Sequence, residues 1–126
     1  MLMENPKVAI VSLNWNGLSH LKYFLPTAEF QSYDNYFVLV VDNGSEDKSV
    51  KFVREKFPKV EIIELGQNLG YSKGFNCGIK YAISLGAEYI LITSNDVKLD
   101  KNIIKEGVSL FLTDRKIGYM SGKIFN

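Results

Sequence analysis

Three short polar clusters in this sequence carry side chains that could bind a charged ligand. They are Asn14-Trp-Asn-Gly17, Asp42-Asn-Gly-Ser45 and Ser94-Asn-Asp96, and each directly follows a largely apolar run. A carboxylate at such a position can hold a divalent cation against phosphates, because hard cations prefer oxygen ligands. Another carboxylate can accept hydrogen bonds from a base or a ribose. Asp42 and Asp96 are the two candidates for these tasks.

Each of these residues also has an interpretation without a ligand. Asp96 could cap the helix that follows, and Asp42 could bond the amides of its own turn, because Asp-Asn-Gly is a strong turn former. Trp15, the only tryptophan, could belong to the core or could wall a ligand pocket. We expect His20 to pack inside a helix, since it has no second His or Cys partner. Cys77 lacks the signature of a reactive thiol and is interpreted as structural.

The hydrophobic pattern predicts the strands that position these clusters. Apolar runs typical of strands buried on both faces occupy residues 7–13, 36–41 and 89–93, and we expect the first and the last to be central. A shorter run interrupted by acids, at 60–65, suits a strand nearer the sheet edge. Residues 117–122 look like one more strand.

The segments between these strands show the apolar spacing of helices. Apolar residues recur three and four apart over about residues 18–28, 46–57 and 71–83, and again after Asp100, which can cap a fourth helix. Gly86 is well placed to end the third helix. The alternation predicts an α/β fold, a mostly parallel sheet with helices on both faces. Because parallel strands share a direction, the three polar clusters fall on one edge of that sheet and would line one crevice.

Glycines repeat four apart in the segment from Asn68 to Gly78, at positions 70, 74 and 78. Each costs a helix about 1 kcal/mol relative to Ala, so close approach to a sheet, loop or ligand is the expected reason for them. Helix–sheet packing explains Gly74 and Gly78 at least as well as a ligand does. Lys73 could neutralise phosphate, although a solvated lysine is the simpler interpretation. The segment matches neither the dinucleotide fingerprint nor the P-loop pattern.

Composition narrows the class of protein. At 126 residues the chain is one domain, and a net charge of +1 gives no excess basic charge for nucleic acid or an anionic membrane. A single cysteine excludes an internal disulfide. No leader and no membrane span is evident, so we expect a cytoplasmic protein. The chain stops at Lys123-Ile-Phe-Asn126, just after a strand-like run, which suggests the first part of something longer.

Taken together, the motifs resemble a known enzyme family. They are Val8-Ala-Ile-Val-Ser-Leu-Asn-Trp-Asn-Gly17, Val40-Val-Asp-Asn-Gly-Ser-Glu-Asp47, Asn68-Leu-Gly-Tyr-Ser-Lys-Gly-Phe-Asn-Cys-Gly78 and Ile92-Thr-Ser-Asn-Asp-Val97. In order and spacing they resemble the N-terminal half of family 2 glycosyltransferases, in particular the rhamnosyltransferase-like branch. The resemblance implies a GT-A fold, which is a Rossmann-like sheet with helices on both faces, and residues 1–126 as a nucleotide-sugar-binding domain. It also implies a UDP- or TDP-sugar donor, an acceptor of unknown identity, and Mn²⁺ or Mg²⁺.

The resemblance also implies roles for individual residues. Nucleoside binding falls to the loop after the first strand and to the acid after the second: Ser12, Asn14, Trp15, Asn16 and Asp42. Asn68 and Gly70 would border the nucleotide. Ser94 and Asn95 stand where the family's Asp-x-Asp motif begins, and Asp96 takes the place of its last acid, the metal ligand. Ser94 departs from that motif, which has an Asp at the first position.

The implied reaction transfers a sugar from a nucleotide-diphospho-sugar to an acceptor hydroxyl, with inversion. A cation at Asp96 would stabilise the charge on the leaving diphosphate. In the family the catalytic base lies in the second half, so no catalytic residue is expected here and the base should lie beyond Asn126. The alternative is a non-catalytic nucleotide-sugar-binding module. A phosphoacceptor signalling domain shares the strand-end acids but would carry paired acids after the first strand. Attachment to the inner membrane face through missing parts is also open.

Overall fold

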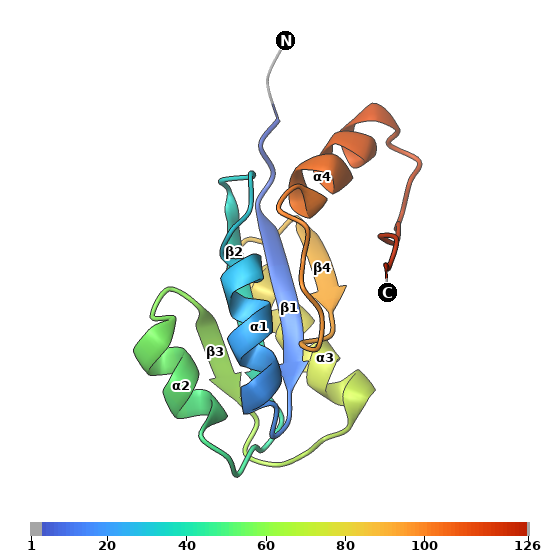
Figure 1. Ribbon diagram of the computed structural model, residues 1–126. Helices are drawn as coiled ribbons and strands as arrows, with labels where there is room; N and C mark the ends of the chain where they lie inside the picture. Colours follow the sequence, from blue (N-terminus) through green and yellow to red (C-terminus); the bar gives the residue numbers. More distant parts are fainter. Residues whose placement is uncertain (1–3, 126) are drawn as a thin grey trace.

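The computed structural model describes residues 4–125, and within that range four strands alternate with four helices (Figure 1). In chain order they are β1 (Val8–Asn14), α1 (Leu18–Ala28), β2 (Tyr36–Asp42), α2 (Ser49–Lys56), β3 (Glu61–Glu64), α3 (Tyr71–Ser84), β4 (Tyr89–Thr93) and α4 (Ile103–Thr113). The expected leaderless N-terminus falls partly on Met1–Met3, which lie outside the described residues, as does Asn126. No helix in the described range is long and apolar enough to span a membrane.

The strands form one sheet in the order β3-β2-β1-β4, and all three neighbouring pairs are parallel. The α/β prediction is therefore confirmed. From β1 the chain moves outward in one direction to β2 and β3, and then crosses back to place β4 on the other side of β1. The strand order thus reverses between β1 and β4. In open parallel sheets, ligands bind outside the carboxyl ends of the strands at this reversal.

Helices cover both faces of the sheet. On one face the side chains of Val8 and Ile10 pack with residues of α1, α2 and α4. The intervening residues Ala9 and Val11 point the other way and pack against α3. Figure 1 shows α1 and α2 in front of the sheet and α3 behind it. This two-sided burial explains why β1 reads as an unbroken apolar run rather than as an alternating one.

Two strand predictions are wrong for the described chain. β4 is not central: it pairs only with β1 at the edge of the described sheet, and Ile92 is 49% exposed. Residues 117–122 form no strand. Residues 118–122 lie across a groove of about 490 Å³ from β4, and α4 lines the same groove. Without backbone pairing to a neighbour, this segment cannot satisfy a strand's hydrogen bonds, and Tyr119 is left 88% exposed.

The predictions for the end of α3 and for the start of α4 have different outcomes. Gly86 ends α3 as expected: it has φ +93, its amide bonds Ile83 O, and the amide of Ala87 reaches back to Ala82 O. Asp100 does not cap α4. The N-cap is Asn102, and the Asp100 carboxylate instead accepts from the Asn102 amide at 2.8 Å, closing a turn just before the helix.

Glycines on α3 allow close packing on the sheet. A Cβ added to Gly74 would lie 2.6 Å from Leu13 Cδ1, and one added to Gly78 would lie 2.4 Å from Val41 Cγ2 and 2.9 Å from Val11 Cγ1. The packing interpretation of these two glycines is confirmed. Gly70 is different, because nothing lies within 4 Å of its added Cβ and its φ is +84. Glycine is favoured at this position because the backbone at the start of the helix is left-handed, a conformation that other residues rarely adopt.

We predict that Gly78→Ala destabilises the protein. The added methyl group would press into two core valines, at a cost of about 1–3 kcal/mol, which outweighs the gain in helix propensity of about 1 kcal/mol. Gly107→Ala in α4 is the matched control, since its Cβ would meet only Met120 Sδ, at 4.0 Å. Urea unfolding should show the first variant less stable and the second unchanged or more stable. Equal stability of the two variants would contradict the packing account.

Candidate functional site

The three polar clusters converge at the carboxyl ends of β2, β1 and β4. Parallel register places Asn14 opposite Asp42, and β4 runs alongside β1 with Thr93 opposite Ser12. Asn14 Nδ2 donates to Asp42 Oδ1 at 3.1 Å, and Asn95 Nδ2 donates to Asn14 Oδ1 at 2.7 Å. All three side chains are at least nine-tenths buried. The predicted common edge therefore exists, and its centre is the strand reversal between β1 and β4.

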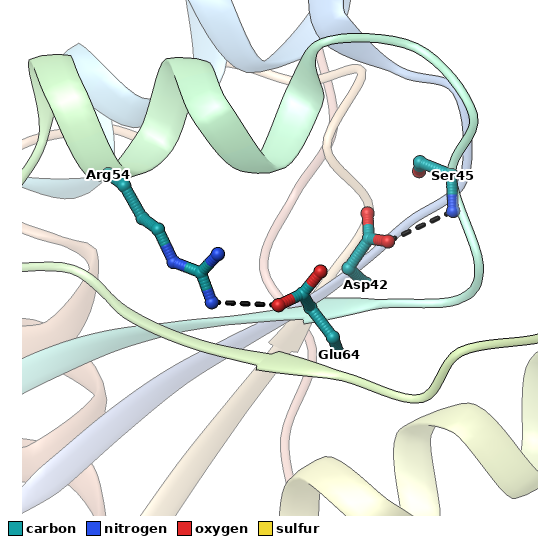
Figure 2. Close-up of polar contacts among 4 residues, drawn as sticks. All are labelled: Asp42, Ser45, Arg54 and Glu64. Atoms are coloured by element: carbon teal, nitrogen blue, oxygen red, sulfur yellow. Dashed lines mark hydrogen bonds and ion pairs between the residues drawn. The ribbon is translucent and has the colours of Figure 1, made fainter.

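Asp42 makes both a local and a long-range contact. One carboxylate oxygen accepts from the Ser45 amide at 2.9 Å (Figure 2), as the turn interpretation expects. The other accepts from Asn14 on the neighbouring strand. Close by in Figure 2, Arg54 of α2 pairs with Glu64 of β3 at 2.7 Å. Both partners of that pair are about half exposed, so it contributes at most about 1 kcal/mol to holding α2 beside the edge strand.

Asn16 joins the loop after β1 to the loop after β2. It adopts φ +49, its amide donates to Ser45 Oγ at 2.8 Å, and its side-chain oxygen accepts from the Glu46 amide at 2.8 Å. The neighbouring Trp15 is 57% exposed. The core interpretation of Trp15 is therefore wrong, and its interpretation as a pocket wall stays a prediction. His20 is also exposed on α1, so the expected packing role is wrong as well.

Asn43 organises the third side of the site, although the sequence interpretation gave it no role. Its side-chain nitrogen donates to Asn68 Oδ1 at 3.1 Å and to Gly70 O at 3.2 Å, while its oxygen accepts from the Leu69 amide at 2.9 Å. The predicted residues Asn68 and Gly70 are thereby brought to the end of β2. The feature of the sequence that could have indicated a role for Asn43 is its position inside a strand-end cluster, because an amide that is buried there must find hydrogen-bond partners.

Asp96 and Ser94 lie at the exposed side of the site. Ser94 Oγ donates to an Asp96 carboxylate oxygen. Within residues 4–125, no group of three or more His, Cys, Asp or Glu side chains could hold a metal ion. Among the side chains described here, Asp96 supplies a carboxylate and Ser94 supplies a hydroxyl beside it. That set fits Mg²⁺ or Mn²⁺ only when substrate phosphates and water supply the remaining oxygens, a common arrangement for magnesium.

Ser12 differs from the other predicted site residues. Its side chain is fully buried in β1, and its hydroxyl has no hydrogen-bond partner among the described residues. It lies two residues before Asn14 and therefore on the same face of the strand. Cys77 is a half-buried free thiol on α3, and Lys73 is an exposed helix residue, as its solvated interpretation expects.

Asp47 is a second residue without an assigned role in the sequence interpretation. Its carboxylate accepts from the Leu18 amide at the start of α1, at 3.1 Å, and from the Ser49 amide at the start of α2, at 2.9 Å. Burial raises the pKa of Asp47, but hydrogen bonds from the Ser49 hydroxyl and from the Ser49 and Leu18 amides outweigh it, and the net pKa lies below its usual value. One acid thus ties together the helices that follow β1 and β2.

Comparison with known proteins assigns the family. The sequence profile described as "Glycosyl transferase family 2" matches residues 7–124. The chain belongs to glycosyl transferase family 2. Among relatives of this family-2 chain is the dTDP-rhamnosyl transferase RfbF of Shigella flexneri, 33% identical over 91 residues, which cover 72% of this chain and 30% of that protein. The chain therefore spans about a third of the length of this relative.

Solved structures of glycosyltransferases share the fold. The mannosyltransferase PcManGT from Pyrobaculum calidifontis, in complex with GDP-Man and Mn²⁺, superposes with a TM-score of 0.76 at 22% identity, covering 86% of this chain and 33% of that one. TarS 1-349 of S. aureus, in complex with UDP-GlcNAc, gives a TM-score of 0.76 at 21% identity, covering 85% and 31%. The family-2 chain therefore has the Rossmann-like GT-A fold that its motifs predict.

We predict a pH-dependent contribution of Asp47 to stability. Because its folded pKa is lowered, the contribution is present above the unfolded value, near about 4, and is lost as the pH falls through the folded pKa. Asp47→Ala should cost about 1 kcal/mol at pH 7, as loss of a helix-start hydrogen bond does. The difference from wild type should shrink below about pH 4 in urea unfolding. Asp47→Asn keeps a hydrogen-bond acceptor without the charge, so its stability at pH 7 should lie between those of the wild type and Asp47→Ala. A stability difference between wild type and Asp47→Ala that does not vary with pH would refute the role given to the carboxylate.

Proposed function

We propose that this chain is the donor-binding part of an enzyme that transfers a sugar from a nucleotide-diphospho-sugar to an acceptor hydroxyl, with inversion at the anomeric carbon. The observation that carries the proposal is the hydrogen-bonded contact of Asp42, Asn14 and Asn95 at the strand reversal. Family membership supports it. The single cysteine suits the cytoplasmic location that we propose with it.

The nucleoside end of the donor is assigned to the loops after β1 and β2. Trp15 is exposed and can stack on a base. Each carboxylate oxygen of Asp42 accepts one hydrogen bond within the protein. Each oxygen therefore has a further lone pair that can accept a hydrogen bond from a base or a ribose. Asn16 holds the two loops together, and Ser12 and Asn14 lie behind this surface. Asn68 and Gly70, drawn in by Asn43, would border the nucleotide on the β3 side.

The diphosphate end is assigned to Ser94, Asn95 and Asp96. A Mn²⁺ or Mg²⁺ ion bound there would offset the negative charge that develops on the leaving nucleoside diphosphate. Asp96 is exposed and can anchor such a cation, and the Ser94 hydroxyl orients its carboxylate. The roles of these residues are electrostatic, and the proton of the acceptor hydroxyl requires a base that we place outside this chain.

The donor nucleotide is proposed to be UDP or TDP. RfbF is named as a dTDP-rhamnosyl transferase, and the TarS structure holds UDP-GlcNAc, whereas the PcManGT structure holds GDP-Man. The alternative is a module that binds the donor without transferring it. Turnover distinguishes the two, because both bind a nucleotide and only the enzyme releases a free nucleoside diphosphate in the presence of an acceptor.

The metal role predicts a specific loss in Asp96→Ala. Isothermal titration of UDP and TDP, each with and without Mn²⁺, should show tighter binding with the metal in the wild type. Asp96→Ala should remove that gain, at least the roughly 10- to 100-fold that loss of even an outer partner costs a metal site. Asp34→Ala is the matched control: it removes an exposed acid that lies just before β2, at the other end of the sheet. Equal metal-dependent binding in the Asp96 variant would exclude the role given to this residue.

The base-stacking role predicts a fluorescence signal from Trp15. It is the only tryptophan, so its emission reports on this loop alone. Titration with TDP should quench the emission, and Trp15→Ala should weaken binding by about tenfold or more, since stacking of a base on an aromatic ring contributes about 1–3 kcal/mol. Trp15→Phe, which keeps an aromatic face, should bind nearly as well in calorimetry. Binding without any quenching would place the base elsewhere.

A further inference from the structure

One buried amide joins the two halves of the proposed donor site. Asn14 donates through Nδ2 to Asp42 Oδ1 at 3.1 Å and to Ser45 Oγ at 3.2 Å. Through Oδ1 it accepts from Asn95 Nδ2 at 2.7 Å. Asn14 is 1% exposed and Asn95 is 9% exposed. The residue on the nucleoside side and the residue immediately before Asp96 are thus connected through a single side chain.

The chemistry of the three groups dictates how each amide is oriented. A carboxylate only accepts hydrogen bonds, so Asp42 requires the nitrogen of Asn14 to face it. The oxygen of Asn14 must then face Asn95, and Asn95 must turn its own nitrogen toward Asn14. Reversing either amide would place two acceptors or two donors in contact inside a buried site. The orientation of the Asn95 side chain therefore depends on Asp42, two strands away in the sheet.

Gly17 provides the space above this contact. A Cβ added to Gly17 would lie 2.5 Å from Asn14 Oδ1 and 2.8 Å from Asn95 Nδ2, the two atoms that form the bond. Gly17 has φ −106, which any residue can adopt, so backbone conformation does not require glycine here. The glycine is needed because its missing side chain leaves room for the bond between Asn14 and Asn95.

We propose that the Asn14–Asn95 hydrogen bond, covered by Gly17, holds the Ser94–Asp96 turn against β1 and so sets the position of Asp96 relative to the nucleoside. Asn14 and Gly17 are positioning residues, since they act through Asp42 and Asn95. This inference rests on the proposed function for its consequence, which is that Asp96 would hold a cation beside the donor diphosphate efficiently only while the bond is intact. The metal-dependent gain in affinity is then the quantity that the bond controls.

The test inserts one methyl group into the contact. Gly17→Ala keeps every functional group of the site and forces Asn14 and Asn95 apart. Gly118→Ala is the matched control, because nothing lies within 4 Å of its added Cβ. Asn95→Ala is the second variant, which removes the bond without adding an atom and serves if Gly17→Ala does not fold. Each variant is titrated with TDP and with UDP, with and without Mn²⁺.

We expect Gly17→Ala and Asn95→Ala to reduce the metal-dependent gain in affinity by about five- to tenfold, the scale of one buried hydrogen bond. In Gly17→Ala, which keeps every functional group of the site, affinity without metal should change much less, and general destabilisation would not produce this pattern. Gly118→Ala should match the wild type in both conditions. An unchanged metal-dependent gain in Gly17→Ala, or in Asn95→Ala if the first does not fold, would overturn the proposal.

A readout without ligand separates this inference from the proposed function. NMR exchange of side-chain amide protons with water should be about tenfold slower for Asn95 than for the exposed Asn76 in the wild type. In Gly17→Ala the Asn95 protons should exchange nearly as fast as those of Asn76, and Asn95→Ala assigns the resonance. If the wild type binds neither nucleotide, the proposed function fails while the exchange rates still decide whether the bond holds the turn. If the Asn95 side-chain protons exchange equally fast in the wild type and in Gly17→Ala, the proposed role of the Asn14–Asn95 bond is refuted.

Discussion

The arrangement of the site depends on the parallel register of β1 with the strands on either side of it. Register places the end of β1 opposite the end of β2, and the reversal of strand order brings the end of β4 to its other side. Each strand then delivers one polar residue to the same place: Asp42, Asn14 and Asn95. Their side chains are buried, so each must find a partner, and the hydrogen bonds among them satisfy that need while connecting three distant parts of the chain.

Around this centre, each further residue of the site serves to hold a loop. Asn16 and Asp47 tie the loop after β1 to the loop after β2, and Asn43 draws in the loop before α3. Glycines make the approach possible, because a Cβ on Gly17 or Gly74 would collide with a neighbouring side chain. The resulting surface has a firm interior of hydrogen-bonded amides and an exposed rim that carries Trp15 and Asp96. Such a division suits the proposed role of binding a charged, flexible donor, because preorganised groups lose little freedom on binding.

A hollow of about 490 Å³ lies away from these strand ends. It runs between β4, α4 and residues 118–122 and contains none of the predicted site residues. Apolar side chains such as Tyr89 and Phe111 line it, and their rings stack at 4.7 Å between centroids. We place the proposed donor site at the strand ends, where the carboxylate of Asp42 and the buried amides of Asn14 and Asn95 converge.

Local pattern by itself determined the four strands and four helices that form and the order of the polar clusters, because apolar runs and helical spacing are properties of neighbouring residues. Family membership also followed from motifs that lie within short stretches. Only the tertiary structure decided the features that depend on contacts between segments distant in the sequence. β4 is an edge strand and residues 117–122 form no strand, because pairing is a property of two segments. The roles of Asn43, Asp47 and Gly17, and the exposure of Trp15 and His20, likewise depend on residues far away in the chain, which no single stretch of sequence contains.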